Sequence, residues 1–389
     1  MKLMITPQAT APSAGSGIFD VYARTDETGQ LFFAAGFPSY PANFSRDGFM
    51  AGIISGNPHI LLAQLHMSAR FQGTRNDPST GEEPGRIHHE LPGAVLPARD
   101  GTTTYNACDT TSLFLIAAES LVHIDRLAGL EFVTHHRASL VAAAQYVAAR
   151  LDKDSLFQKA PPPGAEHYTL RVTYWKDSIL PTGDGAVEPI YPVIYPQAHF
   201  VAARSMLAAS RLLGNKRYAR LADRMYRSGI RHFLRHDGYV AFRDARGEQL
   251  QPSSDELHAL AYIPSEYAGL LPLDNIKARA ARLATPFGFQ CTPTEVATTL
   301  SDRYHGDRVW VIDQAFIHYG AQRFGLDGEA FTAAAVAPYI DEGQELFKVY
   351  ADDDGKLLPI PDGNPRQLWS VAAAEYFAGR SPLAAGQWL

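Results

Sequence analysis

The sequence predicts an all-α protein with an (α/α)6 toroid, two concentric rings of helices, behind a short N-terminal extension. Helical periodicity recurs in about eleven or twelve segments between residues 46 and 380. Segments that are apolar nearly all round, which is typical of buried helices, alternate with segments that have one apolar and one polar face. This alternation indicates an inner helix followed each time by its outer partner.

The N-terminal extension covers residues 1–35, where we expect a short strand pair, and residues 36–389 form one helical domain. The helix pairs that carry the prediction are 111–126 with 130–152, 193–213 with 216–235, and 309–325 with 328–347. In the second pair, an arginine stripe from Arg217 to Arg231 predicts a solvated outer face. A solenoid of helical repeats is the alternative, but no motif recurs at a fixed period.

Connection lengths also favour the toroid. An inner helix is joined to its outer partner by a tight turn such as 213–215, whereas the return connections are long and rich in Gly and Pro. The long connections are 72–106, 153–191, 286–308 and 350–367. In a toroid they all emerge at one end, and long loops on a rigid scaffold are where binding and catalysis concentrate.

Composition excludes several classes of partner. The formal net charge of −6 and the pI near 6.2 give no long-range attraction for nucleic acids or anionic membranes. Cys108 and Cys291 fit neither a disulfide framework nor a zinc cluster. Residues 1–17 do not resemble a signal peptide, and no apolar run reaches the ~20 residues of a membrane span. We therefore expect a cytoplasmic protein with a small-molecule partner, no metal and no cofactor; its oligomeric state stays open.

The long loops hold clusters of charged and aromatic residues, including three of the four tryptophans, Trp175, Trp310 and Trp369. Tryptophan faces stack on sugar rings while charged groups bind the hydroxyls between them, so the combination favours a carbohydrate cleft. Structural roles are the alternative for each cluster. Arg46 and Asp47 can form a helix ion pair, Asp109 can cap a helix, residues 88–90 can bind a metal, and residues 304–310 can serve packing.

Six motifs, in order from about residue 36 to 378, resemble the catalytic domain of amylo-α-1,6-glucosidases, the C-terminal part of glycogen-debranching enzymes. The resemblance to glycoside hydrolase family 63 is more distant. The matching segments are 44–48, the Glu-Pro-Gly-Arg-Ile-His-His-Glu loop at 83–90, Tyr105 with Asp109, Thr110 and Phe114, Trp-Lys-Asp-Ser at 175–178, 304–310, and 367–370.

The resemblance implies an inverting glycosidase, in which a protonated carboxyl group meets the leaving oxygen and a second carboxylate activates water. It assigns the general acid to Asp177, whose neighbour Lys176 would lower the pKa of that carboxyl unless burial or another carboxylate opposes it. Arg46, Asp47 and Asp109 would hold the sugar hydroxyls. The other expected substrate-binding residues are His89, Glu90, Trp175, Lys176, Tyr304, His305, Trp310, Asp313, Gln367 and Trp369.

The catalytic base departs from the family pattern. The family's glutamate position reads Leu-Pro-Ile at 358–360, and a second placement, counted back from a tyrosine, falls on Lys348. Nearby carboxylates are Glu345, Asp352, Asp353, Asp354 and Asp362, and we expect Asp362 because it lies nearest to the last inner helix.

Three other functions stay open on the sequence. They are a phosphorylase, a sugar epimerase that uses histidines (His89, His199, His258, His305), and a glycan-binding protein without catalysis. Debranching enzymes carry further domains before this one, and the chain has almost none, so a small α-glucoside or oligosaccharide is the expected substrate.

Overall fold

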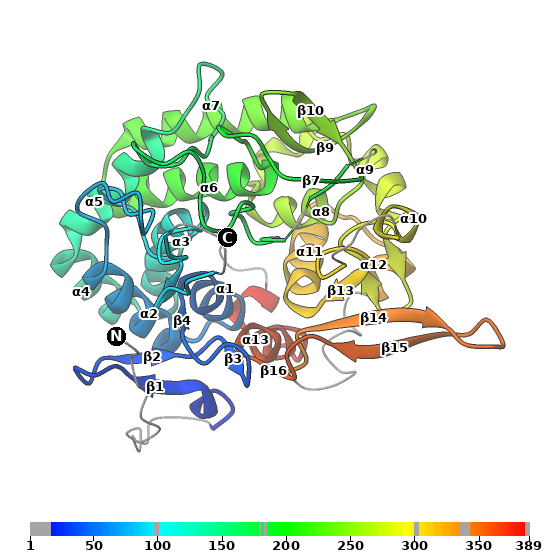
Figure 1. Ribbon diagram of the computed structural model, residues 1–389, viewed down its shortest axis with the longest axis horizontal. Coiled ribbons are helices and arrows are strands. Elements are labelled where there is room, and N and C mark those ends of the chain that lie inside the picture. Colours follow the sequence, from blue (N-terminus) through cyan, green and yellow to red (C-terminus); the bar gives the residue numbers. More distant parts are fainter. Residues whose placement is uncertain are drawn as a thin grey trace.

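The computed structural model describes residues 17–96, 101–178, 180–182, 185–298, 303–333 and 343–385. Within these residues, a closed ring of six helices forms the centre of the molecule (Figure 1). Each helix contacts the next, and the last contacts the first. In order they are α1 (Ser45–Ser55), α3 (Thr110–Ile124), α6 (Pro196–Leu213), α8 (Asp255–Ala259), α11 (Val311–Arg323) and α13 (Leu368–Phe377).

A second layer of helices surrounds this ring, each packed on its inner partner. Helix α2 packs on α1, α4 and α5 on α3, α7 on α6, α9 on α8, and α12 on α11. Their bounds are α2 (Pro58–Arg70), α4 (Arg126–His135), α5 (Arg137–Ala148), α7 (Lys216–Phe233), α9 (Leu273–Ala280) and α12 (Glu329–Ala333). After α13 the described chain ends in the 3-10 turn η5 (Pro382–Ala385), which contacts α13 and α1.

The tight turns between inner and outer helices use the same pair of residue types twice. Gly56 ends α1 and Gly214 ends α6, with φ of +66° and +68°, a left-handed conformation that glycine adopts without penalty. The next residues, Asn57 and Asn215, accept hydrogen bonds from the first backbone N–H groups of α2 and α7. A glycine followed by a capping asparagine therefore reverses the chain in both pairs.

Burial confirms the predicted alternation in the second pair. Most residues of α6 are buried, whereas the arginine stripe of α7, from Arg217 to Arg231, is exposed. Among the described residues no helix combines the length and the apolar character that a membrane crossing requires.

Two predicted helices differ from the structure. Residues 129–152 are interrupted at His136, which separates α4 from α5 with φ −108° and ψ 23°. The helix predicted at 328–347 is wrong at its C-terminal end, because Leu346 already begins strand β14 (Leu346–Ala351); residues 334–342 lie outside the described residues. Strand β14 lies between β13 (Arg308–Trp310) and β15 (Leu357–Asp362), so pairing with distant segments decides its conformation.

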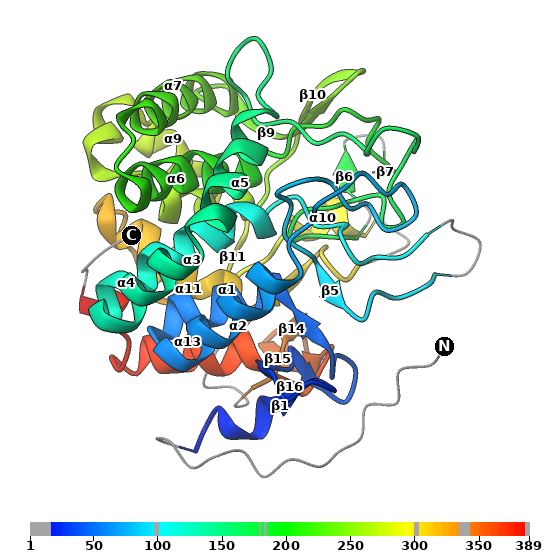
Figure 2. The same cartoon turned by 90° about the vertical axis from the view of Figure 1, so that its left-hand side faces the viewer.

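Short strand pairs join the segments in front of the inner helices. Strand β4 (Asn43–Phe44), before α1, pairs with β5 (Glu90–Leu91). Strand β16 (Arg366–Gln367), before α13, pairs with β3 (Gly36–Phe37). These pairs and the long loops gather on one side of the helices (Figure 2). The N-terminal ends of α1 and α13 are thereby fixed relative to one another.

The remaining strands are short and antiparallel. Strands β1 (Ala23–Thr25) and β2 (Leu31–Phe33) pair in the N-terminal segment, and β2 also contacts α2. The division of the chain at residue 35 stays a prediction. The other strands are β6 (Leu180–Thr182), β7 (Gly185–Val187), β8 (Leu234–Arg235), β9 (Gly238–Asp244), β10 (Gly247–Leu250), β11 (Ala284–Thr285) and β12 (Gly288–Phe289). A further short helix, α10, spans Thr294–Ala297.

Candidate active site

The N-terminal end of one inner helix and the residues before two others carry four of the polar residues predicted for the site. Arg46 and Asp47 lie in the first turn of α1, Asp109 immediately precedes α3, and Gln367 immediately precedes α13. Because the inner helices form a closed ring, these segments from distant parts of the chain meet at one end of the toroid. All four residues are buried.

Arg46 links two carboxylates. Its Nε donates to both Asp109 oxygens, at 3.1 and 2.9 Å, and its Nη1 donates to Asp177 Oδ2 at 3.3 Å. Its Nη2 donates to the carbonyl of Thr173 at 3.3 Å. Asp109 makes no side-chain hydrogen bond as a helix cap, so its carboxylate serves the ion pair. Arg46 therefore joins α1, α3 and the loop that carries Asp177.

Asp177 is the more accessible member of this group, with 29% of its side chain exposed. Burial raises the pKa of Asp177 above its ordinary value; Arg46 lowers it and the charge of Asp109 raises it. The neighbouring Lys176 turns away from Asp177: its Nζ donates to Ser253 Oγ at 2.8 Å and pairs with Asp255 Oδ1 at 3.2 Å. The net shift is upward, the direction that a general acid needs.

A second buried carboxylate, Glu345, lies immediately before β14, 2% exposed. The Tyr304 hydroxyl donates to Oε1 and the Asn364 backbone N–H to Oε2, each at 2.7 Å. The Asn364 carbonyl in turn accepts from the Glu345 backbone N–H at 3.0 Å. Burial raises the pKa of Glu345 to about 7, and the charge of Asp177 contributes in the same direction. The two carboxyl groups are thus electrostatically coupled.

Asp362, the base expected from the sequence, has other surroundings. Its side chain is 45% exposed and accepts from Arg308 Nε at 2.7 Å. Lys348, the other position derived from the family pattern, lies on β14 opposite Arg308 of β13. Glu345 is one of the other candidate carboxylates, and in sequence it lies farther from the last inner helix than Asp362. In the structure, β14 begins at Leu346, and Glu345 immediately before it contacts Tyr304 and Asn364.

A chain of amide groups joins Glu345 to Asp47. Gln367 Nε2 donates to Asp47 Oδ1 at 3.0 Å, and Asn364 Nδ2 donates to Gln367 Oε1 at 2.7 Å. Burial raises the pKa of Asp47 to about 8, against the opposing charge of Arg46. The first and last inner helices therefore share one hydrogen-bonded network, which sequence reasoning did not predict for Asn364.

His89 and Glu90 approach the same region from β5. Glu90 accepts from the backbone N–H of Ala94 at 3.2 Å and from the Thr103 hydroxyl. Burial raises the pKa of Glu90 to about 7, and the charge of Asp177 adds to this effect. The His89 ring contacts the Phe44 ring edge-on, with centroids 5.6 Å apart.

The three predicted tryptophans come together but are almost wholly covered. Trp175, Trp310 and Trp369 are 1%, 2% and 5% exposed, and Trp310 lies perpendicular to both of the others. His305 stacks on Trp310 with centroids 4.5 Å apart, and its Nδ1 lies 2.9 Å from Ser178 Oγ, next to Asp177. The tryptophans thus form a packed layer beneath the site.

Of the four histidines considered for acid–base chemistry, His199 and His258 lie in the core. His89 and His305 lie nearer to the candidate site. His199 lies in the core between the Phe157 backbone N–H and the Met225 carbonyl. His258 contacts Asp313 Oδ1 at 2.7 Å, and both side chains are fully buried. Asp313 is thereby placed in the core rather than among the polar groups around Asp177. Burial lowers the pKa of His89 and of His305 well below the ordinary value.

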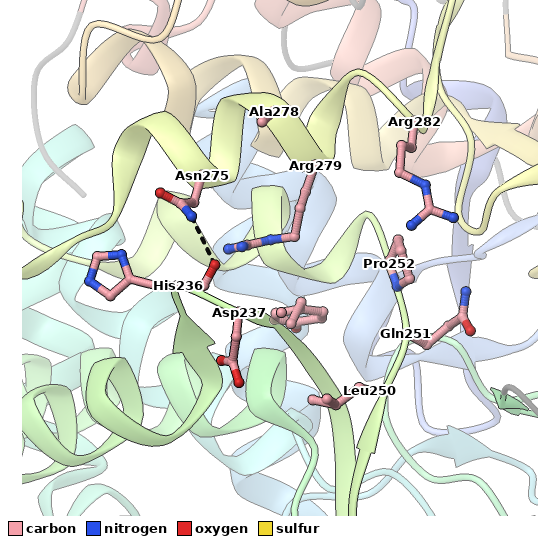
Figure 3. Close-up of a pocket in the computed structure, with 11 residues that line it drawn as sticks. His236, Asp237, Leu250, Gln251, Pro252, Asn275, Ala278, Arg279 and Arg282 are labelled. Carbon is pink, nitrogen blue, oxygen red and sulfur yellow. Dashed lines mark hydrogen bonds between the residues drawn. The ribbon is translucent and has the colours of Figure 1, made fainter.

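A separate pocket of about 370 Å³ lies between the β8–β9 turn, β10 and α9 (Figure 3). His236, Asp237, Arg279 and Arg282 are among its lining residues, and the Asn275 amide donates to the His236 carbonyl at 2.8 Å. Arg279 forms an ion pair with the buried Glu256. None of the side chains predicted for catalysis or substrate binding lines this pocket.

Comparison with known proteins identifies the fold. No family model matches the chain, and no curated protein matches it in sequence. Among solved structures, a GH63 mannosylglycerate hydrolase from Thermus thermophilus in complex with glucose superposes with a TM-score of 0.62 at 13% identity, covering 92% of this chain and 97% of that chain. The same hydrolase with Tris and D-glycerate gives a TM-score of 0.61 at 13% identity, covering 92% and 98%.

Neutral trehalase from Saccharomyces cerevisiae is also similar, with a TM-score of 0.61 at 8% identity, covering 92% of this chain and 76% of that chain. The chain therefore has the helical toroid fold of these glycoside hydrolases, over nearly all of its length.

Proposed function

We propose that this protein is an inverting glycoside hydrolase in which Asp177 is the general acid and Glu345 the general base. The observation that carries the proposal is that hydrogen bonds join both carboxyl groups to the first turn of α1: Asp177 accepts from Arg46, and Glu345 is linked to Asp47 through Asn364 and Gln367. Inversion requires such a pair, one group protonated and the other ionised.

The hydrogen bonds decide which carboxyl group keeps the proton. Glu345 accepts from two neutral donors, Tyr304 and the Asn364 N–H, and such bonds favour the carboxylate. Asp177 has the Arg46 guanidinium at 3.3 Å, but Arg46 makes its shorter bonds to Asp109. In this proposal the catalytic proton is carried by Asp177. The Glu345 carboxylate then takes a proton from water while Asp177 gives its proton to the leaving oxygen.

Glu345 replaces Asp362 as the proposed base because of burial and pairing. Asp362 is half exposed and bound to Arg308. Glu345 is buried, and the charge of Asp177 raises its pKa. A carboxylate at this place also favours hydrolysis over phosphorolysis, because a phosphorylase needs cationic groups for phosphate where a hydrolase needs a base.

The remaining predicted residues divide between sugar contacts and support. Arg46, Asp47 and Asp109 lie at the helix ends, where their polar groups bind sugar hydroxyls in this proposal. Trp175, Trp310 and Trp369 pack against one another, so in this proposal they form the floor of the site rather than stacking faces.

We propose a small α-glucoside or oligosaccharide as the substrate. The similar structures support a small substrate, since one is named as a mannosylglycerate hydrolase, bound to glucose or to D-glycerate, and the other as a trehalase. A likeness to amylo-α-1,6-glucosidases rests on the sequence motifs alone.

The Asp177→Asn variant tests the acid. General acid catalysis contributes about 10²–10⁴-fold, so we expect a loss of that size in glucose release from maltose, isomaltose and trehalose, with substrate affinity nearly unchanged. Hydrolysis of α-D-glucosyl fluoride should fall far less, because fluoride leaves without a proton. Unchanged turnover of the disaccharides in this variant would exclude Asp177 as the acid.

A further inference from the structure

Asp255, the first residue of α8, accepts hydrogen bonds from three consecutive residues of another loop. Tyr174 donates its hydroxyl to Oδ2 at 2.9 Å, and Trp175 donates Nε1 to Oδ1 at 2.7 Å. Lys176 places its Nζ 3.2 Å from Oδ1. Ser253 completes the set with a hydroxyl bond to Oδ2 at 2.9 Å. Asp255 is 1% exposed, so this carboxylate is buried and fully occupied.

The three residues held by Asp255 directly precede Asp177 in the chain. We propose that Asp255 is the positioning residue of Asp177: it fixes the segment that carries Asp177 and neutralises Lys176, so that this ammonium charge does not act on Asp177. The inference rests on the proposed function of Asp177 as general acid. Asp255 itself touches neither Asp177 nor, in this proposal, the substrate.

The bonds of Lys176 show where its charge is compensated. Its three ammonium hydrogens face Ser253 Oγ at 2.8 Å, the Cys291 carbonyl at 3.3 Å and Asp255. Of these three partners, Asp255 alone is charged. Burial lowers the pKa of Lys176, but Asp255, with smaller contributions from Cys291 and Asp313, raises it, and the pKa lies above its ordinary value. The lysine therefore stays charged and depends on Asp255 for its counter-charge.

The other charged groups around Asp177 are already paired or are anionic. Arg46 of α1 is bound to Asp109. Asp47 of α1, Glu90 of β5 and Glu345 before β14 are carboxyl groups coupled to Asp177, and Tyr40 is also influenced by its charge. The pKa of Lys176 is raised by Cys291 and by Asp313 of α11, and the charge of Lys176 lowers the pKa of His305. The charge of Asp255 raises the pKa of Tyr239 of β9. Loss of the Asp255 charge thus leaves Lys176, the residue before Asp177, without its one charged contact partner.

The test compares Asp255→Asn, Lys176→Met and the double variant. Asparagine keeps the size and one acceptor oxygen but removes the charge. The pKa of Asp177 is read by ¹³C NMR of protein labelled at the aspartate carboxyl carbons, with its signal assigned by Asp177→Asn. We expect the pKa of Asp177 to fall by about one unit or more in Asp255→Asn, a tenfold change in its ionisation constant, and to return in the double variant. Lys176→Met alone should raise the pKa of Asp177, because the Asp255 carboxylate then has no counter-charge.

The rate of backbone hydrogen exchange in residues 173–177 measures how firmly Asp255 holds this segment. We expect at least about tenfold faster exchange in Asp255→Asn, since the opening free energy of a segment sets its exchange rate. Glu119→Gln is the matched control: it removes another buried carboxylate from an inner helix, paired with Arg204 and Arg211. It lies about 15 Å along α3 from Asp109, and we expect neither readout to change.

An unchanged pKa of Asp177 together with unchanged exchange in Asp255→Asn would overturn the proposal. If that variant fails to fold, an unchanged pKa of Asp177 in Lys176→Met would overturn it equally. Both readouts need no substrate, so a wild-type protein that cleaves no glycoside would refute the proposed function and leave this test valid.

Discussion

The two carboxyl groups of the proposed site are supported in different ways. Asp177 follows a loop segment that Asp255 holds through Tyr174, Trp175 and Lys176. Charged groups surround it: Arg46 bridges it to Asp109, and Asp255 pairs with the neighbouring Lys176. Glu345 lies at the base of the β14–β15 hairpin, where neutral donors, a tyrosine hydroxyl and a backbone N–H, hold both oxygens. Charges thus tune the acid side, and neutral hydrogen bonds define the base side.

The largest expected effect is the loss of kcat when Glu345, the proposed base, is replaced. We expect Glu345→Gln to lower kcat by about 10²–10⁴-fold, because the amide cannot accept a proton from water. Unlike the acid variant, it should lose α-glucosyl fluoride hydrolysis as well, since water attack is required for every leaving group. Asp362→Asn is the comparison variant, and steady-state rates for both provide the measurement. A large loss in Asp362→Asn with activity retained in Glu345→Gln would reverse the assignment.

Gly363 offers a smaller and more local disturbance of the base side. A Cβ at this residue would lie 2.6 Å from Glu345 Oε2, and its φ of +74° is already unfavourable for alanine. We expect Gly363→Ala to lower kcat about tenfold and to reduce the free energy of unfolding by about 1 kcal/mol.

Gly355, at the far end of the same hairpin, separates the two causes. Its φ is +75°, and a Cβ there meets nothing within 4 Å, so Gly355→Ala carries the same backbone strain without the contact to Glu345. Kinetics and urea unfolding of both variants give the comparison. Equal kcat values in the two variants would show that Gly363 does not protect the geometry of Glu345.

The smallest effect concerns the pH profile. The pKa of about 7 for Glu345 includes the charge of Asp177, so it describes loss of the last proton from the pair and places the alkaline limb near neutral pH. Tyr304→Phe removes a donor to the carboxylate, which raises the proton affinity of Glu345. We expect the alkaline limb of kcat/KM to move up by less than about one unit.

The same substitution should lower kcat severalfold, because more of the shared proton then resides on Glu345, where it is unproductive. Tyr350→Phe, an exposed tyrosine on β14, should leave the profile unchanged. A downward shift of the alkaline limb in Tyr304→Phe would contradict the proposed hydrogen bond to the ionised group.

The sequence predicted the helical fold because apolar periodicity is local, and the second helix pair follows the prediction closely. The prediction of Asp177 as the acid rests on a short intact motif, and the structure places its carboxyl group against Arg46. The sequence favoured Asp362 over Glu345, because the partners of Glu345, Tyr304 and Asn364, are distant in sequence and strand pairing overrides a helical pattern at residue 346.

Other expectations depended on side-chain packing, which periodicity does not describe. Asp313 and Trp175 were predicted to bind substrate, yet both are buried: Asp313 contacts His258, and Trp175 donates to Asp255. The cytoplasmic location and the roles of the individual site residues stay predictions.

The stereochemistry of the wild-type reaction tests the paired roles of Asp177 and Glu345 most directly. Proton NMR during hydrolysis of α-D-glucosyl fluoride distinguishes the two anomers of glucose before they interconvert. Water activated by Glu345 attacks the face opposite the leaving group, so the account predicts β-glucose as the first product. Release of α-glucose first would contradict it, because retention requires one carboxylate to act as a nucleophile rather than as a base.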